Sequence, residues 1–218
     1  MLTKEKLPPL VIAICLVELL IYCWSVWTST LDRSNFFGIE PAFIFDKCAR
    51  IAGRISSVIF LLNLLMVGYY GLKKIYRDEK LKDAFLILIT LFSINHLIHL
   101  LFVLLRFNSH NESIIFEGPV SIGGAIHGVI TFSLIILVPI LLWKFKQLNK
   151  FLYSTIILHL LNSSSFIVKT FLGKIKPPVD PAYHNQLGVV VITVACLYIL
   201  YRVYVENSRD ATSLNGTN

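Results

Sequence analysis

Apolar positions run along the chain in long, nearly unbroken segments, and polar positions gather in the short stretches between them. The alternation of apolar and polar residues that is typical of a strand does not occur. At ~1.5 Å per residue, about 20 helical residues cross a ~30 Å hydrocarbon core, and a helix satisfies its own backbone in lipid. The pattern therefore predicts six transmembrane helices. Their expected ranges are 8–28, 51–72, 83–106, 120–143, 151–172 and 187–204.

Composition points to the same class of protein. The chain has 218 residues, of which 56% are hydrophobic and 15% charged, whereas ordinary soluble domains are about 25% charged. We predict an all-α fold, a polytopic membrane helical bundle over residues 1–208, followed by a polar C-terminal tail over 209–218. The net charge of +7 is spread over the loops, which favours membrane lipids as partners rather than nucleic acid.

Basic residues set the expected orientation. Segment 73–82 carries five Lys or Arg residues and segment 144–150 carries three, and six spans place both segments on one side. Short cytoplasmic loops are enriched in Lys and Arg, so we predict that both termini are cytoplasmic. The expected localisation is an integral protein of a bacterial inner membrane or another cell membrane.

Four histidines lie inside the apolar segments and are the main candidates for function. His96 and His99 share one face of the third predicted helix, while His127 and His159 lie in the fourth and fifth. An imidazole at bilayer depth is costly without a partner, which makes each a candidate site residue. Depth along the helices pairs His96 with His159, and His99 with His127. Such pairs could ligate haem iron, or each histidine could hydrogen-bond a neighbouring helix.

Charged residues at the helix ends suggest an anion site. Arg54 and Arg106 fall on the predicted outer side, together with Arg50 and Lys169. They could hold haem propionates or another anionic group, or simply reach towards lipid phosphates. Glu18 lies within the first span, where it could serve a proton or quinol site or pair with a neighbouring helix. An HExxH motif and a CxxC motif are both absent from the sequence, which argues against a zinc centre.

Three stretches carry a resemblance to a known family. Residues 38–65 contain a Gly-x-x-Pro connection followed by a Gly-bearing helix; residues 82–96 run from a basic start to His96; and residues 143–153 read WKFKQLNKFLY. Together they resemble the ferric-reductase-like transmembrane domain family, in the small six-helix form that serves as the haem subunit of bacterial methionine-sulfoxide reductase. In that pattern His96 occupies the position of a haem ligand.

The chain departs from this family pattern in the fifth helix. Asn149 stands where the family has a histidine at the start of that helix, and Trp143 lies two residues too early. Asn162 stands at the second histidine position, while His159 lies nearly one helical turn before it. The resemblance therefore carries over only His96 directly as a ligand, with His159 as a substitute for the missing partner.

Two interpretations follow. In the first, the chain is a membrane haem b protein that passes electrons from a quinol or a flavin donor to an acceptor on the outer side, as the membrane redox subunit of an oxidoreductase. His96 and His159 would be the iron ligands, and a flavoprotein donor would be a separate redox partner protein. In the second, the chain is a haem-free membrane assembly, lipid-binding or small-solute transport protein. Its histidines would then be structural or would relay protons.

Overall fold

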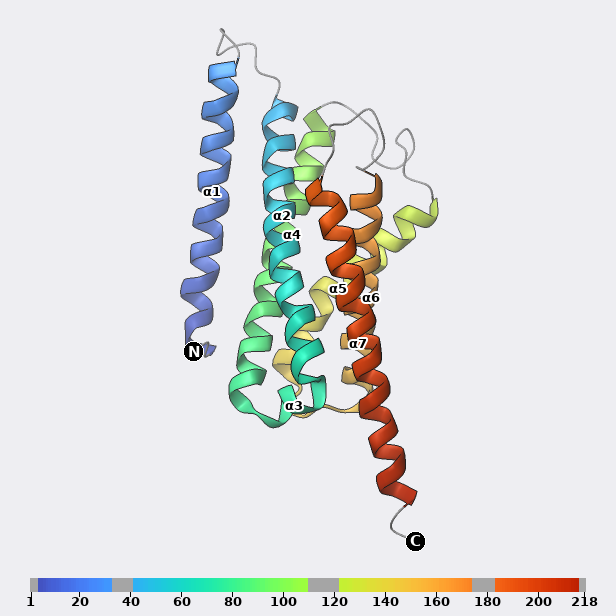
Figure 1. Ribbon diagram of the computed structural model, residues 1–218. Helices are drawn as coiled ribbons and strands as arrows, with labels where there is room; N and C mark the ends of the chain where they lie inside the picture. Colours follow the sequence, from blue (N-terminus) through green and yellow to red (C-terminus); the bar gives the residue numbers. More distant parts are fainter. Residues whose placement is uncertain (1–3, 33–40, 110–121, 174–182, 216–218) are drawn as a thin grey trace. The chain divides into compact units, whose positions relative to one another are not determined.

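The protein is helical throughout the part that the structure describes. The computed structural model describes residues 4–32, 41–109, 122–173 and 183–215, and within these ranges no strand occurs. A short 3-10 helix, η1 (Lys4–Lys6), precedes seven α-helices (Figure 1). These are α1 (Leu7–Asp32), α2 (Pro41–Tyr70), α3 (Leu72–Arg77), α4 (Glu79–Ser109), α5 (Ile122–Lys144), α6 (Lys150–Gly173) and α7 (Tyr183–Asn215).

Six of these helices are long and apolar enough to cross a membrane. Only α3, with six residues, is too short among the described α-helices. The predicted fold class is thus confirmed as an all-α membrane protein with six spanning helices, and their apolar surfaces indicate contact with lipid. The orientation of the termini stays a prediction.

The start of α2 differs from the prediction. The sequence pattern placed residues 41–50 in a loop, but α2 begins at Pro41. Proline suits the first turn of a helix because its fixed φ is already helical and its missing N–H would have no partner there. Asp46 and Arg50, four residues apart, form an ion pair along the helix surface. The helix therefore begins before its apolar stretch, in a segment whose charged residues pair with each other.

The basic segment 73–82 is also more ordered than a loop. Gly71 ends α2 with a φ of 76°, a left-handed conformation that glycine adopts without steric cost. The chain then forms α3 and reverses into α4, as Figure 1 shows. Asp78 precedes α4, and its Oδ1 accepts hydrogen bonds from the backbone N–H groups of Lys80 and Leu81 at 2.9 and 3.2 Å. Such side-chain caps are typical of helix starts.

At the other end of the chain, α7 extends further than expected. It continues to Asn215, through most of the segment predicted as a polar tail.

The chain divides into two compact units. One contains residues 61–86 and 130–218, and the other contains residues 2–60 and 87–129. In the second unit, small and apolar side chains from α2 and α4 form a core of Cys48, Ala49, Ala52 and Phe102. Small residues let helix backbones approach closely.

The first unit is built from α6 and α7, which contact each other, with parts of α2, α4 and α5 and all of α3. Ile156 and Leu160 of α6 and Ile199 of α7 are fully buried. Polar residues join α5 to α6, since the Asn162 amide donates a 2.7 Å hydrogen bond to Thr131 Oγ1.

Candidate functional site on α2 and α4

Polar and aromatic contacts join α2 to α4 at four successive levels of one unit. The residue numbers rise along α2 as they fall along α4, which is the register of two antiparallel helices. On each helix the contacting residues are three, four or seven apart, so they lie on one face. In order along α2, the pairs are Asp46 with Arg106, Ala49 with His99, Ser56 with Asn95, and Phe60 with Phe92.

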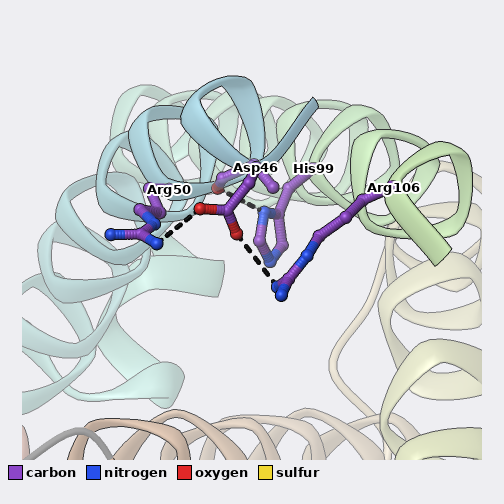
Figure 2. Close-up of polar contacts among 5 residues, drawn as sticks. Asp46, Arg50, His99 and Arg106 are labelled. Carbon is purple, nitrogen blue, oxygen red and sulfur yellow. Dashed lines mark hydrogen bonds and ion pairs between the residues drawn. The ribbon is translucent and has the colours of Figure 1, made fainter. Parts of the chain in front are cut away.

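At the first level, one carboxylate is shared by two arginines. Asp46 Oδ1 lies 2.9 Å from Arg106 Nη1, and Asp46 Oδ2 contacts Arg50 (Figure 2). The Asp46 side chain is 16% exposed, against 43% for Arg106 and 66% for Arg50. The interhelical pair is therefore the better shielded one. The sequence pattern does not single out Asp46 because it predicts a loop there, although the four-residue spacing from Arg50 is a usable signal.

At the second level, the imidazole of His99 is held by the backbone of α2. Its Nδ1 lies 2.8 Å from the carbonyl oxygen of Ala49, as Figure 2 also shows. A carbonyl only accepts, so Nδ1 carries a proton and, in the neutral imidazole, Nε2 carries the lone pair. Gly53 makes room for the ring, because a Cβ there would lie 3.0 Å from His99 Cε1. The structure thus fixes both the position and the tautomer of His99.

At the third level, Asn95 of α4 contacts α2 and is fully buried. Its amide nitrogen donates to Ser56 Oγ at 2.7 Å and to the Ala52 carbonyl oxygen at 3.0 Å. In lipid such interhelical hydrogen bonds contribute about 0.6 kcal/mol on average. Asn95 therefore fixes the register of the two helices next to the histidines.

The remaining candidates of this unit are His96, His127 and Arg54. His96 is buried, with its ring 5.3 Å from that of His99 and 5.3 Å from that of Phe92, measured between centroids. His127 is half-buried near the start of α5, and Arg54 is exposed on α2. The structure therefore places His96 next to His99 on α4, with Arg106 two turns further along the same helix.

A second polar feature of this unit lies on α1. Glu18 is 3% exposed, and neither of its carboxylate oxygens has a hydrogen-bond partner among the described residues. Ser25 and Ser29 are buried too. They follow Glu18 by seven and eleven residues, so they lie on the same face of the helix. This face of α1 is polar and turned away from solvent.

His159 belongs to the other unit, in α6. It is fully buried, and its Nδ1 lies 3.3 Å from Ser163 Oγ, one turn further along the helix. If Nδ1 carries the proton and donates to Ser163, Nε2 has the lone pair that an iron requires. Lys169, the fourth predicted outer cation, is exposed on the same helix.

The two asparagines at the histidine positions of the pattern that the sequence resembles both make local hydrogen bonds. Asn149 caps α6, with its Oδ1 accepting a 2.8 Å hydrogen bond from the backbone N–H of Leu152. Asn162 ties α6 to α5 through Thr131. These two positions therefore serve local stability in this chain.

Within the described ranges, no group of three or more His, Cys, Asp or Glu side chains converges as a site for a metal ion. No protein-family model matches the chain, and comparison with curated proteins and with solved structures finds no significant match.

Proposed function

We propose that the protein is a membrane haem b protein that transfers electrons as the membrane redox subunit of an oxidoreductase. The observation that carries the proposal is the 2.8 Å hydrogen bond between His99 Nδ1 and the Ala49 carbonyl oxygen. Histidines that bind a metal almost always donate their other ring N–H to a carbonyl, a carboxylate or water, which fixes the tautomer and the ring orientation. His99 has this arrangement before any ligand binds.

The residues of α4 fit a haem in further respects. His96 lies one turn from His99 and is buried, so its imidazole is shielded from water. The sequence-based candidates for axial ligands are His96, His99 and His127 in this unit and His159 in the other unit. Haem, when bound, would supply a one-electron carrier whose potential depends on those ligands and on burial.

Arg54 and Arg106 are the proposed partners of the haem propionates. Arg106 already pairs with Asp46, so a propionate there has to share the guanidinium with that carboxylate. Arg54 is exposed on α2, one turn from Arg50. A guanidinium can bind two carboxylates at once because it presents five donors in one plane.

The proposed partners follow from the chemistry. A quinol in the membrane or a flavin on a separate redox partner protein would donate electrons, and the acceptor would lie on the outer side. Six spanning helices support the integral membrane location, and the family resemblance points to a bacterial inner membrane as one such location. That resemblance, to ferric-reductase-like transmembrane domains, supports the haem and the donor classes as proposals.

A specific observation favours a second candidate, a haem-free protein with structural histidines. Several polar groups that join α2 to α4 already have protein partners: Asp46 pairs with its arginines, and the Asn95 amide nitrogen donates to Ser56. Polar side chains between membrane helices commonly act in this way. In this alternative, the protein would serve membrane assembly, lipid binding or small-solute transport.

The visible spectrum of the purified protein separates the two candidates. The full chain is expressed in haem-replete cells, purified in mild detergent, and measured before and after reduction with dithionite. We expect a Soret band and a sharp reduced α band. A colourless protein, from cells whose other b-type cytochromes are fully loaded, would favour the haem-free alternative.

A further inference from the structure

A second site lies in the unit that contains α6 and α7, and not in the unit of His96 and His99. A cavity of about 670 Å³ opens between α3, the connection from α5 to α6, the first turn of α6, and α7. All its lining residues belong to this one unit. Those that matter here are Lys73, Arg77, Lys146, Lys150, Tyr76 and Tyr153.

The charged residues that line this cavity are all positive. Four of its lining residues are cations, and no described Asp or Glu lines it. The neighbouring acid is Glu206, whose Oε2 accepts a 3.3 Å hydrogen bond from Tyr153 and whose backbone oxygen accepts a 3.1 Å bond from Lys73 Nζ. Glu206 therefore positions two residues that line the cavity, Tyr153 and Lys73. Arg77, Lys146 and Lys150 are exposed, so their charged ends can reach a ligand in the opening.

The cavity also offers neutral donors. It includes the start of α6, where Asn149 caps the helix and the helix dipole adds partial positive charge. Burial raises the pKa of Tyr76 well above its usual value, so this phenol keeps its proton at neutral pH and can donate a hydrogen bond. Cations, backbone N–H groups and the Tyr76 phenol together match the oxygens of a phosphate.

The position of the cavity suggests where that phosphate comes from. The span of α5 ends at Lys144 and the span of α6 begins at Lys150, so the cavity lies at the end of two spanning segments. Phospholipid headgroups occupy this level of a bilayer, and basic pockets between helix ends bind anionic headgroups. We propose that this cavity binds the phosphate group of an anionic membrane phospholipid. The proposal is independent of haem binding.

Lipid titration of the purified full chain tests the proposal. Dioctanoyl phosphatidylglycerol, dioctanoyl phosphatidylcholine and inorganic phosphate are each titrated by calorimetry below the micelle concentration of the lipids. The site variant is Arg77→Gln with Lys150→Gln. The matched control, Lys80→Gln with Lys144→Gln, removes two exposed cations from the same basic segments without touching the cavity lining. Arg77→Lys retains the charge at the site, and circular dichroism verifies the fold of each variant.

We expect saturable binding of phosphatidylglycerol. Each lost cation should weaken it about fivefold, hence on the order of 25-fold in the site variant. The affinities of the control variant and of Arg77→Lys for phosphatidylglycerol should stay within about threefold of that of the parent protein. Equal affinity in the site variant and the control would overturn the proposal. Binding of inorganic phosphate but not phosphatidylglycerol, lost in the site variant, would also overturn it and assign the cavity to a soluble phosphate.

Discussion

The carboxylate of Asp46 on α2 lies 2.9 Å from the guanidinium of Arg106 on α4. This ion pair forms one end of a series of contacts that continues through His99 and Asn95 (Figure 2 shows the first two levels). The histidines of α4 are therefore held between a charged pair and a buried amide. Their positions depend on the register of two helices rather than on one local motif.

Asp46 and Arg106 should be energetically coupled. We expect a double-mutant cycle with Asp46→Asn and Arg106→Gln to give a coupling of about 1 kcal/mol, near the upper end for partly exposed pairs. The same cycle with Arg50→Gln should give only about 0.3 kcal/mol, because Arg50 is more exposed and on the same helix. Urea unfolding in mild detergent measures both. Equal couplings would contradict the assignment of the interhelical pair as dominant.

Gly53 should be required by the imidazole of His99. Alanine is normally favoured over glycine in a helix by about 1 kcal/mol, but a Cβ at Gly53 lies 3.0 Å from His99 Cε1. Gly53→Ala should therefore give no stabilisation in the parent protein. In a His99→Ala background the close contact is gone, and the same change should stabilise by roughly 1 kcal/mol. Thermal unfolding of the four proteins measures this, and an equal effect in both backgrounds would contradict the packing.

Gly71 should tolerate no side chain. Its φ of 76° costs an L-residue about 1–2 kcal/mol, and a Cβ there would also clash with the Glu206 carboxylate. Gly71→Ala should lower the free energy of unfolding by at least ~1 kcal/mol. Adding Glu206→Ala should relieve only the clash, so the double variant Gly71→Ala with Glu206→Ala should still have a lower free energy of unfolding than Glu206→Ala alone. A Gly71→Ala protein as stable as its parent would rule out the left-handed turn before α3.

The basic segment between α2 and α4 should face the cytoplasm. Lys80→Cys, in a background where Cys15, Cys23, Cys48 and Cys196 are replaced by Ser, places one thiol at the exposed start of α4. In intact cells, a membrane-impermeant maleimide should leave it unlabelled until the membrane is opened. Labelling of intact cells would reverse the predicted orientation.

Sequence alone predicted the six spanning helices, because apolar length is a local property that any lipid-crossing helix has to show. It did not predict the first turns of α2 or the whole of α3. Charged residues interrupt the apolar pattern there, and the helical structure nearby is supported by an ion pair and a side-chain cap. Asn149 and Asn162 were interpreted as replaced ligands, and the structure adds their roles as a helix cap and an interhelical donor.

The partners of the candidate site could not be predicted. His99 and Asn95 both bond to backbone carbonyl oxygens, which every residue carries and no sequence pattern reveals. Identifying Ala49 and Ala52 requires the register of α2 against α4, and that register results from packing of small side chains. The ion pair with Asp46 depends on the same register, so Arg106 was placed correctly at a helix end but without its partner.

The most direct test of the central claim is the reduced-minus-oxidised visible spectrum of His99→Ala beside the parent protein and a His184→Ala control. Loss of the axial imidazole should remove half or more of the haem or turn its spectrum high-spin, while His184→Ala, at the start of α7 outside the span, should match the parent. The same spectrum of His96→Ala, His127→Ala and His159→Ala tests each of the other candidate ligands. A parent protein without haem, or a His99→Ala protein with an unchanged low-spin spectrum, would contradict the claim that α4 binds haem through His99.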